Sequence, residues 1–178
     1  KEISEIRSVA SFFLSRVDTN VDKLLASQDK QYQGLQGKAA NANAKLAYEQ
    51  YNKIFNGTDF VEIRNAGGHV QRCLWARVST NNPTFSDVLY IEPRIGKDTV
   101  TTVPDDTLKA FADHGIAADP LASVISEAHS TIDTLRSTGI VTEKLAEELH
   151  MHGGQKVEEG FRQLPGCLDA KEDTGAEA

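Results

Sequence analysis

Short apolar runs alternate with helical patterns along most of this chain. Residues 8–14 are a nearly continuous apolar run, as expected for a strand that is covered on both faces. Residues 38–55 carry alanines and aromatic side chains at helical spacing up to an Asn-Gly pair, and they predict an amphipathic helix. Two more strands are predicted at 70–76 and at 99–103, where β-branched residues are frequent.

The segments between these elements carry weaker signals. Residues 18–26 are expected to form a loop that leads into a short helix. The polar residues 28–37 are expected to form a linker within the domain. Residues 88–91 have the propensity of a strand.

The last third of the chain is expected to be helical. Its helices are predicted at residues 104–115, 119–139, 142–149 and 155–164. Asp119 is the expected N-cap of the second of these helices, with Pro120 at its first position and Gly139 as its C-cap. We expect one domain over residues 1–165 and a disordered acidic tail over residues 166–178.

The order of strands and helices implies parallel strands that are joined by helical crossovers. By itself this order fits half of a barrel or a small open sheet. The net charge of −7 argues against general binding to nucleic acid or to an anionic membrane, because both need a basic surface. No apolar run approaches the roughly 18 residues that span a membrane.

Cysteine is sparse in this sequence. Cys73 and Cys167 are too few and too far apart for a disulfide framework or a zinc site, and Cys73 is expected to be a buried thiol. This use of cysteine favours the cytoplasm, or a plastid, over secretion.

Arg16 follows directly after the first apolar run, where the strand is expected to end and a loop to begin. A guanidinium is always charged, and its planar fork suits a phosphate or a carboxylate. An acidic chain that takes an anionic substrate needs such a local cation. The alternative is an ion pair between Arg16 and Asp18 or Asp22, since surface ion pairs are common.

Several ordered blocks of the sequence resemble one enzyme family. These blocks are residues 9–18, 37–48, 70–76, 82–90, 98–104 and 111–115. In this order and spacing they resemble the transaldolases of the long bacterial and plastid-type branch, from about the sixth barrel strand onward. The resemblance implies an α/β fold that is a partial (β/α)8 barrel, with the last three parallel strands, their crossover helices and C-terminal helices. It also implies that residues 88–91 are a loop with a short helical turn.

The resemblance assigns roles to the first two strand ends. The family holds the substrate phosphate with a Ser and an Arg at five-residue spacing, which Ser11 and Arg16 match. An aromatic residue that lines the family's site falls on Phe13. Trp75 and Ser79 are expected to line the same site from the second strand end.

The second strand end departs from the family pattern. After Trp-Ala the family typically has Ser-Thr, a small residue and a Lys just before Asn-Pro, whereas this chain has Arg77, Val78, Ser79 and Asn81. Arg77 and Ser79 have the same parity on an extended strand, so they are expected to face one side, where Arg77 would supply a second phosphate contact. The alternative is a diverged loop with altered substrate affinity.

Metal and cofactor chemistry is not indicated. His150 and His152 lie two residues apart and would point to different faces of a helix, so no metal site is predicted there. The resemblance implies that no metal and no organic cofactor is needed. The hydroxyl groups of Thr101 and Thr102 either line the site or serve barrel closure.

No residue of this chain is assigned as catalytic. Transaldolases form a Schiff base between a lysine and a ketose carbonyl, and the resemblance places that lysine on an earlier strand. The chain begins at Lys1 and its only methionine is Met151. We therefore expect a piece of a longer protein, whose N-terminal half of the barrel is its partner.

Two functions remain open. In the first, this chain is the phosphate-binding side of a transferase that moves a dihydroxyacetone unit between sugar phosphates in the pentose phosphate pathway, and alone it is inactive. In the second, it is a non-catalytic half-barrel, from a degenerate paralogue or a split gene, that binds a partner or a sugar phosphate. Unpaired strand edges favour a homo-oligomer in both cases.

Overall fold

The structure is a computed structural model that describes residues 2–80, 82–142, 144–145, 147–148, 151 and 158. The chain divides into two compact units, Lys1–Ile140 and Val141–Ala178. The first unit contains the sheet. Within the described residues, no helix combines the length and the apolar character that a membrane crossing requires.

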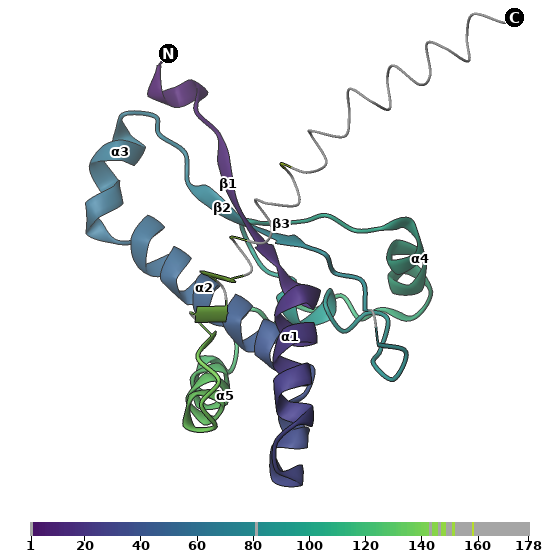
Figure 1. Ribbon diagram of the computed structural model, residues 1–178. Coiled ribbons are helices and arrows are strands. Elements are labelled where there is room, and N and C mark those ends of the chain that lie inside the picture. The colour runs from purple at the N-terminus through teal and green to yellow at the C-terminus, as the bar shows by residue number, and fades with distance from the viewer. Residues whose placement is uncertain are drawn as a thin grey trace, which may run out of the picture. The chain divides into compact units, whose positions relative to one another are not determined.

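The sheet has three parallel strands in the order β1-β2-β3 (Figure 1). They are β1 (Ser8–Phe13), β2 (Gln71–Ala76) and β3 (Thr99–Thr101). β1 and β2 pair residue by residue over their whole length, and Cys73–Trp75 pair with β3. The predicted α/β class with three parallel strands is confirmed, and it is consistent with a partial (β/α)8 barrel.

Helices lie between and after the strands. The α-helices are α1 (Leu14–Ala26), α2 (Ala39–Phe55), α3 (Val61–Asn65), α4 (Asp105–His114) and α5 (Ile125–Ser137). The 3-10 turns are η1 (Ile3–Glu5), η2 (Lys30–Leu35), η3 (Thr58–Phe60) and η4 (Glu92–Arg94). The helix α2 is central, because it packs against α1, α5 and β2 (Figure 1). The predictions for α2 and α4 are confirmed to within a residue or two.

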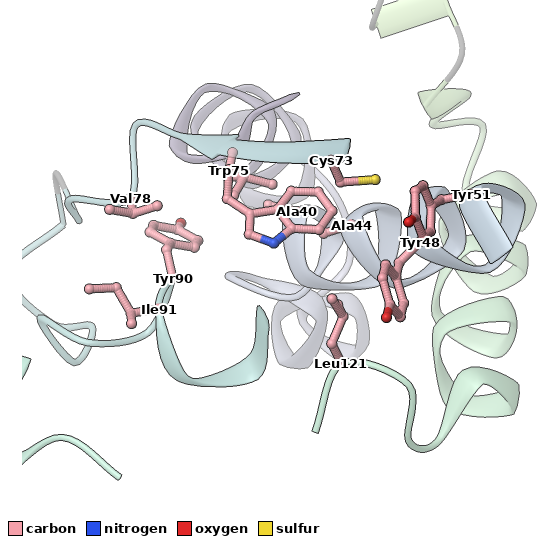
Figure 2. Close-up of a cluster of buried hydrophobic side chains, with 11 residues drawn as sticks. Ala40, Ala44, Tyr48, Tyr51, Cys73, Trp75, Val78, Tyr90, Ile91 and Leu121 are labelled. Atoms are coloured by element: carbon pink, nitrogen blue, oxygen red, sulfur yellow. The ribbon is translucent and has the colours of Figure 1, made fainter. Parts of the chain in front are cut away.

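One face of the sheet is buried against α2. Paired residues of a parallel ladder point to the same face, and Phe12 pairs with Trp75. Their ring centroids are 5.4 Å apart, and Trp75 is 0% exposed. Figure 2 shows Trp75 pointing from β2 toward Ala40 and Ala44, the small residues that let α2 approach the strand.

The opposite face of the sheet is open. Val9, Ser11 and Phe13 alternate with the buried-face residues of β1, and Val9 and Phe13 are 40% and 52% exposed. The prediction of a strand at residues 8–14 is therefore confirmed, but the prediction that both of its faces are covered is wrong. The physical reason is packing: α2 covers the face of Phe12 and Trp75, whereas Val9 and Phe13 on the other face stay exposed.

The helix α1 corrects the prediction of a loop at residues 18–26. It starts directly after β1 and presents a buried stripe at helical spacing, namely Leu14, Asp18, Val21 and Leu25. In the sequence Asp18 interrupts this apolar stripe, because an acidic residue is expected to be exposed. In the fold Asp18 is 1% exposed and belongs to the core.

The start of α5 also differs from the prediction. Asp119 and Pro120 do not cap it, because Leu121 turns into the core, where it is 0% exposed and its N–H donates to the Ile95 carbonyl at 3.4 Å. The helix starts at Ile125 instead and ends before Gly139, whose φ of +85° fits the predicted C-cap.

The remaining element predictions have mixed outcomes. Residues 88–91 are turns and not a strand, as the family resemblance implied. In the predicted helix 142–149, the described residues 142, 144–145 and 147–148 are helical. The predicted helix at 155–164 and the predicted tail at 166–178 lie outside the described residues, apart from the helical residue 158.

Two aspartates of α1 hold the start of α2. Asp18 Oδ1 accepts a hydrogen bond from the Ala40 N–H at 2.7 Å, and Asp22 Oδ1 accepts one from the Gly37 N–H at 3.0 Å. Gly37 has φ of +71°, and a Cβ there would lie 3.0 Å from the Phe85 ring, so this tight joint needs glycine.

Burial raises the pKa of Asp18 from 3.8 to about 6, against the lowering effects of the Ala40 N–H, Tyr90 and Arg94. Oδ2 of Asp18 has no hydrogen-bond partner among the described residues, so its desolvation is only partly offset. Because the folded pKa lies above the unfolded one, the ionised carboxylate costs stability. The contribution is favourable below pH 3.8 and is lost as pH rises through about 6.

We therefore predict that Asp18→Asn removes a pH dependence of stability. Relative to this variant, the wild-type chain should lose up to about 3 kcal/mol of unfolding free energy between pH 4 and pH 7. Urea denaturation at each pH, followed by the fluorescence of Trp75, the only tryptophan, measures this difference. The matched control is Asp106→Asn, whose carboxylate is fully exposed. Wild-type and Asp18→Asn curves that run parallel would contradict the prediction.

Candidate functional site

A cavity lies where the carboxyl ends of the three strands meet. It measures about 330 Å³ and is lined by Ser15, Arg77, Ser79, Thr102, Val103 and Pro104. Ser15 belongs to the first turn of α1, directly after β1. Arg77 and Ser79 follow β2, and Thr102 follows β3. Each strand thus contributes its following segment, which is where parallel α/β folds carry their sites.

The backbone of Arg77 shapes one wall of the cavity. Arg77 has φ of +55°, a left-handed conformation that costs a residue with a Cβ on the order of 1 kcal/mol. Its carbonyl accepts a hydrogen bond from the Ser15 N–H at 3.3 Å, which joins the β2 end to α1. On the other side, the Thr102 N–H donates to the Trp75 carbonyl at 3.0 Å.

The cavity is polar and cationic. Ser15, Ser79 and Thr102 each offer a hydroxyl group, and Arg77 offers a guanidinium that is exposed to solvent. None of the described lining residues is acidic. Guanidinium and hydroxyl donors without a competing carboxylate suit a phosphate or a carboxylate group of a ligand.

Arg77 and Ser79 are brought together as predicted, but for a different reason. The prediction assumed an extended strand through both residues, whereas β2 ends at Ala76 and Arg77 is left-handed. The turn at Arg77, and not strand parity, brings both side chains to the cavity wall.

The three residues predicted at the first strand end form a neighbouring group. Ser11 and Phe13 lie on the open face of β1, and the Arg16 guanidinium lies 5.8 Å from the centre of the Phe13 ring. Arg16 is in the first turn of α1 and not in a loop, so it directly follows Ser15 of the cavity. Ser11, Phe13 and Arg16 are not among the lining residues of the cavity.

The alternative ion pair of Arg16 is not formed among the described residues. The carboxylates of Asp18 and Asp22 accept backbone N–H groups of the segment that starts α2. The Arg16 guanidinium packs over an aromatic ring instead, a contact that leaves its hydrogen-bond donors available.

Trp75 lies away from the cavity. It is 0% exposed on the sheet face that packs against α2, and Thr101 points to the same face. Thr102, the next residue, reaches the cavity, where its hydroxyl also lies 3.4 Å from the Trp75 carbonyl. Of the two threonines left open by the sequence, Thr102 is the one that lines the cavity.

Ser15 is the polar lining residue that sequence reasoning missed. The neighbouring Arg16 was selected as the candidate because it is a cation. Ser15 was expected to lie in a loop, which does not define where its side chain points. The sequence did contain a signal for Ser15. Leu14, Asp18 and Val21 form a short stripe at helical spacing, and Ser15 lies beside this stripe in the first turn of the helix. Ser15 is 4% exposed, so its direction is fixed by packing.

The described residues hold no group of three or more His, Cys, Asp or Glu side chains that could bind a metal ion. His114 contacts Asp87 at 2.9 Å and Asp113 at 3.3 Å, and these contacts raise the pKa of the exposed imidazole. Cys73 is 4% exposed, as predicted, and burial raises the pKa of its thiol to about 11. His150 and His152 lie outside the described residues.

The fold and the cavity together define an α/β protein whose parallel strand ends surround a polar site. The chain matches the family described as Transaldolase/Fructose-6-phosphate aldolase over residues 2–167. It is 40% identical to "Transaldolase 2" of Nostoc punctiforme over 185 residues, which is 96% of this chain and 48% of that relative. It is 41% identical to "Transaldolase" of Parafrankia sp., covering 92% of this chain and 45% of that relative.

A third relative, "Transaldolase" of Mycolicibacterium smegmatis, is 39% identical over 95% of this chain and 47% of its own length. The chain belongs to the transaldolase/fructose-6-phosphate aldolase family. It spans about half the length of the curated relatives that it matches.

The strain at Arg77 leads to a prediction on stability. Arg77→Gly should be more stable than Arg77→Ala by about 0.5–1 kcal/mol, because glycine adopts a positive φ without the Cβ clash while losing some chain entropy. Urea denaturation of both variants measures the difference. The control is Ser79→Gly, which should lower the unfolding free energy, since Ser79 has no positive φ. Equal stability of both Arg77 variants would show that the turn carries no strain.

Proposed function

We propose that this chain is the phosphate-binding side of a transaldolase-like transferase. The full-length protein would move a dihydroxyacetone unit between sugar phosphates in the pentose phosphate pathway, through a lysine Schiff base. The observation that carries this proposal is the cavity at the three strand ends, with one guanidinium and three hydroxyl groups as donors. Membership in the transaldolase family supports the reaction class.

Arg77 and Ser15 have the clearest roles in this proposal. The Arg77 guanidinium supplies the charge, and the hydroxyl groups of Ser15, Ser79 and Thr102 supply directed donors. Arg16 would approach the same anion from the adjacent position on α1, while Ser11 and Phe13 would line the open face of the sheet next to it.

The reacting amine is proposed to come from outside this chain. None of the described lysines lines the cavity, and a Schiff-base lysine needs burial or a neighbouring positive charge to lower its pKa. The N-terminal half of the barrel would supply that lysine and cover the open face of β1. A cytoplasmic or plastid location stays a prediction that rests on the sparse cysteines.

The second candidate is a non-catalytic half-barrel that binds a sugar phosphate or a partner chain. The exposed Val9 and Phe13 on the edge strand favour this function, because they offer an unpaired edge and an apolar face. A strand with a buried lysine encoded upstream of residue 1 would favour the transferase, and an upstream sequence without one would favour the binding module.

We predict that Arg77→Ala and Arg16→Ala each weaken the binding of fructose 6-phosphate to this chain about tenfold, the usual size of a lost charged hydrogen bond. Isothermal titration calorimetry measures this loss, and unphosphorylated fructose is the ligand control. Arg7→Ala is the matched control variant, since it removes an exposed guanidinium that precedes β1. Equal affinity for fructose and its phosphate would contradict the anion site.

We also predict that this chain alone forms no Schiff base. Incubation with fructose 6-phosphate and borohydride, followed by mass spectrometry, should leave every lysine unmodified, because no described lysine lies at the cavity. A full-length transaldolase under the same conditions is the positive control. A stable adduct on any lysine of this chain would overturn the proposal that the amine lies outside it.

A further inference from the structure

A histidine at the end of α4 lies between two carboxylates. The Nε2 atom of His114 lies 2.9 Å from Oδ1 of Asp87, and its Nδ1 atom lies 3.3 Å from Oδ2 of Asp113. An ionised carboxylate only accepts hydrogen bonds, and a neutral imidazole carries a single N–H. Both contacts can therefore be hydrogen bonds only when the His114 ring is protonated and both of its nitrogens donate.

The two carboxylates belong to different chain segments. Asp113 precedes His114 on α4, so the contact between these two residues stays within one helix. Asp87 belongs to the segment after β2, which begins with Arg77 and Ser79 in the cavity wall. The contact from His114 to Asp87 thus joins the end of α4 to the segment after β2.

The segment that carries Asp87 is fixed in the core. Val88, Tyr90 and Ile91 follow it within four residues, and all three are buried. The Ile91 N–H donates to the Val88 carbonyl at 2.9 Å, which closes a turn in this segment. Asp87 is therefore a fixed point to which a less firmly packed element can be attached.

The helix α4 is packed much less firmly. Of its ten residues, all of which the structure describes, only Thr107 is buried, and Phe111 packs against the core while it stays partly exposed. The helix begins directly after Pro104, which lines the cavity together with Thr102 and Val103. Because α4 lacks a buried face, the contacts at its two ends decide where it lies.

Both ends of α4 are attached to the segments around β2. Before its start, the Thr102 N–H donates to the Trp75 carbonyl at 3.0 Å. After its end, the Ile116 N–H donates to Oε1 of Glu92 in η4 at 2.8 Å, two residues beyond the contact of His114. Histidine is the residue type that titrates near neutral pH, so the attachment through His114 is the one that pH can release.

We propose that protonated His114 is a positioning residue: it holds the end of α4 to Asp87 and so keeps the cavity wall of residues 102–104 in place against Arg77 and Ser79. This proposal rests on the anion-binding function proposed above. His114 is not among the lining residues of the cavity, and it acts through the placement of α4.

The charged groups around His114 set the pH at which it holds α4. Asp87 faces the ring from the segment after β2, Asp113 faces it from α4, and Glu92 of η4 lies at the Ile116 N–H. The contacts with Asp87 and Asp113 raise the pKa of the imidazole above its ordinary value of 6.5. Both contacts therefore form at pH 5.5, and they are lost as pH rises through the raised pKa, so that at pH 9 a neutral ring can keep one hydrogen bond at most.

Amide exchange of Ile116 tests the attachment without any anion. At pH 5.5 the Ile116 N–H should exchange about two- to fivefold faster in Asp87→Ala and in His114→Ala than in the wild-type chain, which is the usual size of an exposed ion pair. The matched control is Asp113→Ala, which removes the same charge and also contacts His114, but only within α4, so exchange should stay unchanged. Unchanged exchange in Asp87→Ala, or equal acceleration in Asp113→Ala, overturns the proposal.

Sulfate binding tests the consequence for the cavity, because sulfate keeps its charge from pH 5.5 to pH 9. At pH 5.5 Asp87→Ala and His114→Ala should each bind sulfate about two- to fivefold more weakly than the wild-type chain. These two variants change the net charge in opposite directions, so an effect of charge alone would strengthen binding in Asp87→Ala. Asp113→Ala should bind sulfate as well as the wild-type chain or better. Stronger binding by Asp87→Ala overturns the proposal.

The pH profile separates positioning from a merely structural role. The ratio of wild-type to His114→Ala affinity for sulfate should be about two- to fivefold at pH 5.5 and nearer to one at pH 9. The same ratio at both pH values overturns the proposal. A wild-type chain that binds no sulfate would refute the proposed anion site, and faster Ile116 exchange in Asp87→Ala would then still support the attachment of α4, whereas unchanged exchange would overturn it.

Discussion

The parallel pairing of β1 with β2 is the constraint on which the rest of this structure depends. The six residues of each strand pair without a break, so both strands end at the same level. Their following segments, α1 and the turn at Arg77, must then start side by side, and the cavity forms between them. A shift of one residue would exchange the two faces of β1 and bury Ser11 and Phe13 in place of Phe12.

The two faces of the sheet serve different purposes. Phe12 and Trp75 pack toward α2 and give the unit its core, which the small side chains Ala40 and Ala44 allow to close tightly. The other face carries Ser11 and Phe13, which stay exposed. Stability therefore comes from one side of the strands, and the candidate site residues stand on the other side and at the strand ends.

The sequence predicted those elements whose local pattern and tertiary role agree. The helix α2 was found because its buried residues are alanines and aromatics at helical spacing, and the strands because they are short apolar runs. The helix α1 was missed because Asp18 interrupts its stripe, and the start of α5 was misplaced because Leu121 is drawn into the core. In both cases a long-range contact overrode a sound local rule.

The candidate site was predictable in part for the same reason. Residue type identified Arg77 and Ser79 as candidates. No sequence pattern predicts that an arginine has a left-handed backbone conformation, because the surrounding chain imposes that conformation. Ser15 was hidden because its direction depends on where α1 begins. Spacing predicts which side chains share an element, whereas a cavity is made by elements that are far apart in sequence.

The residue that interrupts the α1 stripe also has an energetic cost. A buried carboxylate is seldom worth more than an apolar side chain of the same volume, because its charge must leave water. Leucine at position 18 would have completed the α1 stripe and made the helix obvious from sequence. An aspartate there costs stability at neutral pH, and yet its carboxylate accepts the Ala40 N–H and so joins α1 to the start of α2. The residue that breaks the local pattern is thus the one that makes a directed hydrogen bond between two helices, which an apolar residue cannot make.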